Sequence, residues 1–260
     1  MSDSLSSPNK KSNSWKKEVQ SWIQLLLFVL CIKTFVFENC NVPTESLKPT
    51  ILKGDYVFVS KYSYGYSKYS LPFFMPLFEG RLFFSKPERG EIIVFWPPKN
   101  VPKQERFVKR LIGLPGDKIE IIEGVIHIND KAIQKISNGK FIDEEGNRYN
   151  SFIETLPNDF SYEIIESQNI LFGKKFYNAG PYNVPSGHYF FMGDNRDDSA
   201  DSRSDLGFIM EENLIAKAQI LYFSAAKPLF EFGVSEWWNS IRWERIFSSL
   251  YTTPEVTNNN

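Results

Sequence analysis

A mostly apolar run near the N-terminus, interrupted by Gln24 and Lys33, constrains the fold more than any other feature of the sequence. The run, WIQLLLFVLCIKTFVF, extends from Trp22 to Phe37 and follows a flank with lysines at positions 10, 11, 16 and 17. A membrane-spanning helix needs about 17–25 residues, so the run alone is a little short for a span. Lys33 lies near one end, where its ammonium can reach the polar interface. We therefore predict one transmembrane helix over residues 20–38, after a disordered, basic, cytoplasmic segment over residues 1–19.

A cleaved signal peptide and a buried core helix are the two other interpretations of this run. A cleaved signal ends in small residues of the A-x-A kind, whereas this run is followed by Glu38, Asn39, Cys40 and Asn41. A core helix rarely begins with a tryptophan behind a basic flank. We therefore expect an uncleaved anchor, with its lysines on the cytoplasmic side and the rest of the chain facing outward.

Short apolar segments alternate with turn residues beyond the anchor. Strand patterns occur at residues 54–61, 90–96, 106–113, 117–122, 125–128, 188–193 and 215–224. The GLPGD sequence from Gly113 to Asp117 predicts a tight turn between two of these strands. Helical periodicity is scarce outside the anchor. The sequence therefore predicts a mostly β protein, with an antiparallel β-sheet body after one N-terminal transmembrane helix.

Polarity divides this body further. Residues 39–129 and 186–226 carry the strand patterns and form the predicted main β domain. Residues 130–185 are more polar and irregular, and predict a smaller inserted β region. Residues 227–260 form an aromatic C-terminal segment and tail. In that segment a short amphipathic helix is predicted, because four residues follow helical spacing: Trp238, Ile241, Arg242 and Arg245.

Aromatic residues concentrate in two stretches, 62–86 and 228–251. The first contains Pro72 and Pro76, which disfavour a regular central strand. Tryptophan and tyrosine favour the membrane interface, where one end of the ring is in an apolar phase and the other is wet. We therefore predict that membrane lipids are partners of these stretches, which include Phe73, Phe74, Trp237 and Trp238.

Composition excludes several other classes of function. A net charge of −1 predicts no nucleic-acid partner. Two cysteines, one of them inside the apolar run, argue against a disulfide framework. The two histidines, His127 and His188, both lie within strand patterns, so a histidine-based catalytic triad is hard to build.

Lys109 is an unusual residue in a predicted strand. Its neighbour is Arg110, and successive strand side chains point to opposite faces, so one of the two must face the core or a cleft. Burial disfavours the ammonium form, and a pKa of about 8 in place of about 10.4 costs about 3 kcal/mol. A neutral amine can accept the proton of a serine hydroxyl. Ser46 follows the anchor closely, although taken alone its sequence context favours an ordinary loop serine.

The acidic segment GDNRDDSADSR, at residues 193–203, lacks the alternating order of a calcium loop. Its two arginines offset the acids, so we predict a charge-paired loop and no metal site. Such networks hold side chains in fixed rotamers.

Together these segments resemble the bacterial type I signal peptidases. Four motifs in family order carry the resemblance, from the anchor to about residue 223: VPTESLKPT (42–50), RGEIIVF (89–95), FVKRLIGLPGDK (107–118) and GDNRDDSADSR. It implies a membrane-anchored serine protease that removes signal peptides from exported preproteins after small residues, with no cofactor. It also implies the inner (cytoplasmic) membrane, with the catalytic domain on the outer, periplasmic side.

The resemblance assigns roles to particular residues. Ser46 matches the nucleophile and Lys109 the general base, while the Thr44 hydroxyl and the Ser46 N–H match the oxyanion hole. Ser199 matches the serine that orients the lysine. Three valines match the apolar positions that line the pockets for the substrate's small residues: Val42, Val94 and Val108. Five charged residues match a supporting salt-bridge network: Arg110, Asp194, Arg196, Asp201 and Arg203. Glu45 departs from the common glycine and is expected to point away from the cleft; Leu47 and Ile51 are volume-conserving departures.

Two alternatives remain from the sequence. A dedicated Ser-Lys peptidase would process one substrate, such as a pilin-like protein, or cleave itself as some repressors do, although the anchor argues against self-cleavage. The chain would otherwise be a non-catalytic, membrane-anchored β binding module. A cleavage assay on several substrates distinguishes a dedicated peptidase from a signal peptidase. Removal of the Ser46 hydroxyl distinguishes a binding module from an enzyme, because the module would lose no function.

Overall fold

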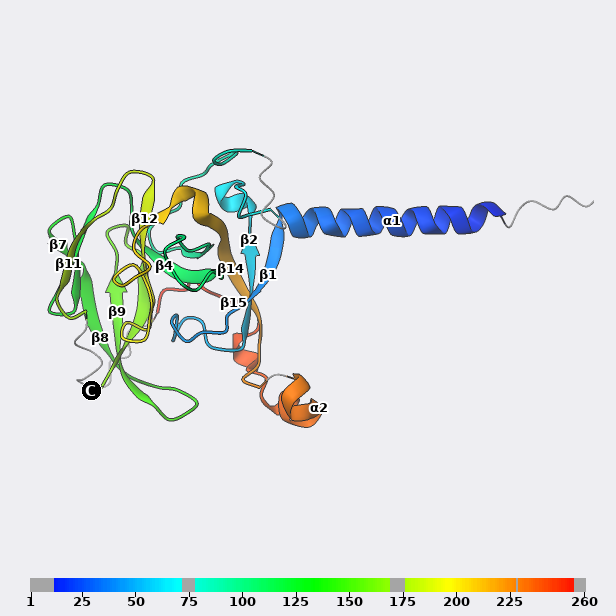
Figure 1. Cartoon of the computed structure of the whole chain (residues 1–260). Coiled ribbons are helices and arrows are strands. Elements are labelled where there is room, and N and C mark those ends of the chain that lie inside the picture. Colours follow the sequence, from blue (N-terminus) through cyan, green and yellow to red (C-terminus); the bar gives the residue numbers. More distant parts are fainter. Residues whose placement is uncertain (1–11, 72–77, 169–175, 228, 255–260) are drawn as a thin grey trace, which may run out of the picture.

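A single long helix leads into a β-rich body (Figure 1). The computed structural model describes residues 12–71, 78–168, 176–227 and 229–254. Within these residues one helix, α1 (Ser12–Phe35), is long and apolar enough to cross a membrane, over Trp15–Phe35.

The limits of α1 differ from those predicted. The helix begins at Ser12, inside the segment predicted to be disordered, because extending a formed helix costs far less than nucleating one. It ends at Phe35, since Phe37 and Glu38 pair with Ser60 and Val59 and so belong to the first strand. The outer end of the predicted anchor is therefore part of the sheet.

The main sheet carries the body and is antiparallel throughout. In spatial order its strands are β1 (Phe37–Asn41), β2 (Asp55–Ser60), β14 (Leu214–Ser224), β3 (Ile92–Phe95), β4 (Phe107–Gly113), β12 (His188–Met192) and β13 (Ile209–Met210), with β15 (Ser248–Ser249) paired to β14. Short 3-10 turns, η1 (Tyr62–Tyr64) and η3 (Glu211–Asn213), lie between strands. The predicted mostly β, antiparallel fold with an N-terminal apolar helix is confirmed.

Two smaller sheets complete the body. One has the order β10 (Ser161–Ser167), β9 (Arg148–Thr155), β8 (Gln134–Ile142); the other has the order β11 (Ala179–Asn183), β5 (Lys118–Ile122), β6 (Val125–Ile128), β7 (Lys131–Ala132). The strands β5 and β6 precede residue 130, the predicted start of the inserted region, yet they pair with β11 and β7. Both smaller sheets and the main sheet contribute to one apolar core, which includes Ile119 of β5, Ile164 of β10 and Phe190 of β12.

The C-terminal segment departs from the predicted helix. Helix α2 spans Leu229–Asn239, with a break at Gly233 (φ 78°), and ends where the Ser240 hydroxyl donates to the Trp237 carbonyl at 2.7 Å. Beyond it, Ile241 forms a β-bridge with Ala225, and η4 (Trp243–Arg245) follows. Helical spacing over residues 238–245 gave the wrong limits, because tertiary contacts override local periodicity here.

Candidate functional site

Ser46 lies on a short helical turn in the connection between β1 and β2. The Ile51 N–H donates to the Leu47 carbonyl at 2.9 Å, which closes the turn. Leu47 and Ile51 are fully buried in the main core and fix the turn there. Ser46 is 6% exposed, and its Oγ lies 3.3 Å from the Thr44 Oγ1. Hydrophobic packing on one side of the turn thus presents both hydroxyls on the other.

Lys109 approaches the same place from the sheet. It lies in β4 opposite Ile93 and is 4% exposed. Ser46, Lys109, Thr44 and Val108 all line one cleft of about 470 Å³. The structure therefore brings together the predicted nucleophile, base and oxyanion hydroxyl, which are distant in the sequence.

Burial changes the acid–base properties of Lys109. Desolvation lowers its pKa from 10.5 to about 8, although the negative charge of Asp201 opposes the shift. No ion pair or hydrogen bond to this amine occurs among the residues that the structure describes. About one tenth of the Lys109 side chains therefore carry a neutral amine at pH 7.

Arg110 faces the opposite side of β4 and is fully buried. It donates to both carboxylate oxygens of Asp194, each at 2.7 Å, and to the Gly90 carbonyl at 2.8 Å. The Thr50 hydroxyl donates to the same carboxylate at 2.6 Å. This paired charge ties the Ser46 turn, through Thr50, to the acidic loop and to the strand that carries Lys109.

Gly193 allows the acidic loop to approach Ser46 closely. A Cβ on this glycine would lie 2.3 Å from the Ser199 Oγ and 2.4 Å from the Ser46 carbonyl oxygen, which no side chain tolerates. Next to it, the Asn195 N–H donates to the Ser46 carbonyl at 3.1 Å and its amide donates to the Glu45 carbonyl at 3.3 Å. The loop thereby holds the backbone of the predicted nucleophile.

Ser199 is buried beside this contact. Its Oγ has no hydrogen-bond partner within the described part of the chain. A buried hydroxyl without a partner costs about 1–3 kcal/mol, so such groups usually have a functional or solvent explanation.

Ion pairs hold the rest of the acidic loop. Arg203 donates to the Asp201 carboxylate at 2.9 and 2.8 Å, and the same carboxylate accepts from the Gly193 N–H at 3.0 Å. Burial raises the pKa of Asp201, but the charge and hydrogen bonds of Arg203 outweigh it and lower the pKa overall. Arg196 forms a two-pronged ion pair with buried Glu154 of β9. The predicted charge-paired loop is therefore observed at these residues.

Lys48 carries a third ion-pair cluster, on the Ser46 turn itself. Its ammonium lies 2.8 Å from Glu45 and 3.0 Å from Asp143, at the tip of the β8–β9 hairpin. Burial raises the pKa of Asp143, but hydrogen bonds from Asn147 and Lys48 lower it to about 2. Glu45 does line the cleft, but its carboxylate is held by this lysine.

Only one of the three valines predicted to line the substrate pocket lines the cleft. Val108 lines the cleft, whereas Val42 and Val94 are 2% and 1% exposed and pack beneath it in the main core. Val94 is the cross-strand partner of Val108.

Sequence reasoning missed several residues that position the site: Gly193, Asn195, Thr50, Lys48, Asp143 and Glu154. Gly193 and Asn195 were in a recognised motif, and the glycine was a usable signal for close backbone approach. Asp143 and Glu154 belong to the irregular inserted region and had no sequence signal. Across residues 12–71, 78–168, 176–227 and 229–254, no group of His, Cys, Asp and Glu has the arrangement of a metal site.

Comparison with known proteins bears on this arrangement. The family profile described as "Signal peptidase, peptidase S26" matches residues 15–223. A Signal peptidase I of Rickettsia conorii is 46% identical over 267 aligned positions, which cover 96% of this chain and 99% of the relative. That of Rickettsia felis is 45% identical, over 96% of this chain and 100% of the relative. The crystal structure of a signal peptidase I from Enterococcus faecalis is 26% identical and covers 51% of this chain and 97% of that one, with a TM-score of 0.30.

The family match includes α1, the Ser46 turn, β4 with Lys109 and the acidic loop, and the relatives match over nearly their whole length. The chain therefore belongs to the signal peptidases of peptidase family S26, a family of membrane-anchored serine endopeptidases.

Proposed function

We propose that this signal peptidase cleaves signal peptides from preproteins with Ser46 as the nucleophile and Lys109 as the general base. The observation that carries the proposal is their common cleft, in which burial lowers the pKa of Lys109 to about 8. An amine with that pKa is matched to proton transfer near neutral pH.

Neutral Lys109 takes the proton of the Ser46 hydroxyl, and the oxygen attacks the scissile carbonyl carbon. The Ser46 N–H and the Thr44 hydroxyl donate to the oxyanion that forms. Collapse of this intermediate breaks the peptide bond; protonated Lys109 gives its proton to the leaving amine and becomes neutral again. Lys109 then takes a proton from water, which attacks the Ser46 ester, releases the signal peptide and restores the hydroxyl.

Ser199 positions the lysine in this proposal. Its buried Oγ, which lacks a partner within the described residues, accepts a hydrogen bond from the Lys109 amine as that amine turns toward Ser46. The Asp194–Arg110, Asp201–Arg203 and Arg196–Glu154 pairs keep the loop in place around it. These three pairs are buried, so loss of one partner would leave an uncompensated charge.

The substrate side of the cleft favours small residues. Val108 supplies an apolar wall, with Val42 and Val94 packed behind it, so the space next to Ser46 is limited by a close-packed core. We propose that these three valines set the preference for small side chains at the cleavage site.

The anchor sets where cleavage occurs. We propose that α1 crosses the inner membrane with its basic end in the cytoplasm and the β body on the outer side. From Phe35 to Ser46 the chain reaches at most about 40 Å when extended. The cleft therefore stays near the membrane surface, where translocated preproteins emerge.

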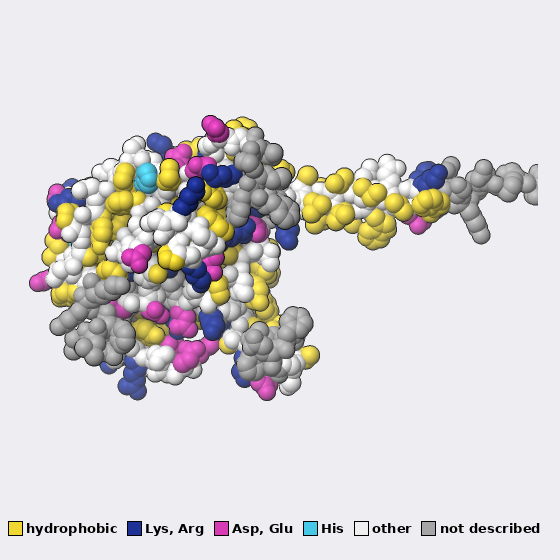
Figure 2. Space-filling model, in the orientation of Figure 1, with side chains coloured by type: hydrophobic (Ala, Val, Ile, Leu, Met, Phe, Trp, Pro, Cys, Tyr) yellow, Lys and Arg dark blue, Asp and Glu magenta, His cyan; other side chains and the backbone are white. Residues whose placement is uncertain are grey.

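A row of aromatic rings is the proposed second contact with lipid. This row of rings runs from β2 and β14 through α2 to η4, with successive centroids 4.1–6.3 Å apart: Phe58, Tyr222, Tyr56, Phe223, Trp237, Trp238 and Trp243. Figure 2 shows hydrophobic side chains along this flank, between the base of α1 and α2. Trp238 and Trp243 are more than half exposed. The predicted contacts of Phe73 and Phe74 lie outside the described residues.

The lipid contact has a direct test. A body that begins at residue 36, the first beyond α1, should co-sediment with phospholipid vesicles. Replacing Trp238 and Trp243 with serine should weaken that binding while circular dichroism shows an unchanged fold. A body that stays in the supernatant at every lipid composition would overturn the aromatic attachment.

Cleavage itself is tested with the full chain in detergent and a panel of preproteins. The wild type should remove signal peptides from several of them, whereas Ser46→Ala should not; Ser186→Ala, at an exposed serine, is the matched control. Cleavage of one substrate only would favour a dedicated peptidase. Normal cleavage by Ser46→Ala would overturn the proposed nucleophile.

A further inference from the structure

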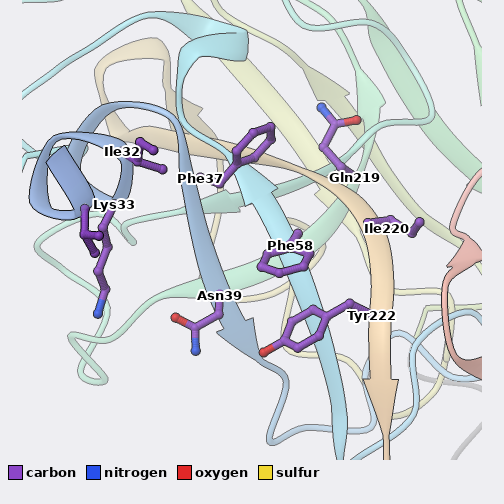
Figure 3. Close-up of a pocket in the computed structure, with 9 residues that line it drawn as sticks. Ile32, Lys33, Phe37, Asn39, Phe58, Gln219, Ile220 and Tyr222 are labelled. Atoms are coloured by element: carbon purple, nitrogen blue, oxygen red, sulfur yellow. The ribbon is translucent and has the colours of Figure 1, made fainter. Parts of the chain in front are cut away.

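An apolar groove of about 740 Å³ lies between the end of α1 and the outer face of the main sheet (Figure 3). Its walls come from α1, β1, β2 and β14: Val29, Ile32, Lys33, Phe37, Asn39, Phe58, Gln219, Ile220 and Tyr222. Phe37 and Phe58 are 41% and 38% exposed. Apolar surface costs about 25 cal/mol per Å² when it faces water, so a groove of this kind favours an apolar occupant.

The groove and the catalytic cleft lie on opposite faces of β1. Side chains alternate along a strand, and Phe37 and Asn39 line the groove. Glu38, between them, instead accepts from Arg106 at 2.6 Å, and Arg106 lines the cleft. A preprotein held at Ser46 therefore occupies the other side of this strand and leaves the groove open.

The groove continues the membrane-spanning surface of α1. Val29, Ile32 and Lys33 belong to the last turns of the span over Trp15–Phe35. The junction is fixed, because the Tyr66 hydroxyl donates to the Phe35 carbonyl at 2.7 Å and the Lys61 N–H donates to the Val36 carbonyl at 3.0 Å. Phe58 and Tyr222, stacked at 4.1 Å, also begin the aromatic row that leads to α2.

The polar groups of the groove suit an amphipathic ligand. Lys33 is exposed and supplies an ammonium at the rim, while the Asn39 side chain lies beside the Tyr222 hydroxyl. A cation and neutral donors around apolar walls match the phosphate and the acyl chain of a phospholipid. We propose that the groove is a binding site for a single phospholipid of the bilayer leaflet from which the β body emerges.

This inference rests on the proposed membrane attachment of the signal peptidase and extends it to a defined site. A lipid there fills the gap between anchor and sheet. It thereby couples the orientation of the β body to the bilayer surface.

Photo-crosslinking tests the site with the full chain in phospholipid nanodiscs. The probe is a phospholipid with a diazirine in its acyl chain, and adducts are mapped by mass spectrometry. We expect adducts on Phe58 and Ile220 in the wild type, and at least a fivefold loss at Ile220 in Phe58→Asp. Ile142→Asp, at an equally apolar and more exposed position on β8, should leave these adducts unchanged.

Two outcomes would overturn the lipid site. The first is adducts along α1 without any on β2 and β14. The second is loss of the β2 and β14 adducts when Ser46→Ala protein is saturated with a preprotein, since the groove would then hold the signal peptide. Cleavage of a preprotein by the wild type in the same nanodiscs is measured in parallel: its absence would count against the proposed function, independently of where the lipid adducts form.

Discussion

Cleavage by this signal peptidase should slow about tenfold for each pH unit below 8, because Lys109 must be neutral to accept the proton of Ser46. Burial lowers the pKa of Lys109 from 10.5 to about 8. At pH 7 about one tenth of the enzyme then carries a neutral amine, against about 0.03% at the unshifted value. Burial thus raises the active fraction about 300-fold at that pH.

Removing a negative charge near Lys109 should change the pKa of its amine. Asp198 is exposed in the cleft, and its negative charge raises the pKa of Lys109. Asp198→Asn should therefore move the acid limb of kcat/KM to lower pH. Asp205→Asn, which removes a carboxylate from another part of the same cleft lining, is the matched control and should shift it less.

The assay is the pH dependence of kcat/KM between pH 6 and 10 on a fluorogenic signal-peptide substrate in detergent. The expected half-point for the wild type is near 8. A rate that is flat across this range, or a half-point near 10.5, would refute the argument that a desolvated lysine is the base.

Three other changes have defined outcomes. Thr44→Val keeps the shape of the side chain and removes one oxyanion donor, so kcat should fall about 100–1,000-fold with little change in KM; a loss below about threefold would make this hydroxyl structural. Lys109→Met should raise the free energy of unfolding by up to about 3 kcal/mol below pH 8, because there the lysine is protonated in both the folded and the unfolded state and its buried charge is costly. This gain should vanish as the pH rises toward 10.5. Denaturant unfolding at pH 7 and pH 10 measures it, and an equal gain at both pH values would contradict the argument. Glu154→Gln leaves Arg196 buried without its countercharge and should cost about 3–5 kcal/mol of unfolding free energy, whereas a loss below about 1 kcal/mol would mean that the pair contributes little.

Local sequence signals predicted the elements that carry the site. Strand β4 was evident from its apolar run, and its adjacent Lys109 and Arg110 indicated that one of the two faces the core or a cleft. In the structure both are buried, Lys109 at the cleft and Arg110 against Asp194. The four motifs brought Ser46 and the acidic loop into the same hypothesis. Side-chain alternation and motif order are local properties, so the sequence alone carries them.

Non-local contacts could not be predicted in this way. The limits of α1 depend on Phe37 pairing with Ser60, and the predicted helix at residues 238–245 gives way because Arg242 and Arg245 contact Asp55. The partners of Lys48 and Arg196 lie in the polar inserted region, where no periodicity or motif marks Asp143 or Glu154. The sequence contains many other carboxylates, and only the tertiary structure determines which of them pair with Lys48 and Arg196.

A double-mutant cycle on preprotein cleavage tests the central claim, that Ser46 and Lys109 act as one unit. The measurement is kcat for the wild type, Ser46→Ala, Lys109→Met and the double variant, with Lys135→Met as the control for loss of another largely buried lysine. Each single variant should lose nearly all activity, and the double variant should be no worse than either, because each partner is useless without the other. Independent, additive losses, or near-normal turnover in either single variant, would contradict the account.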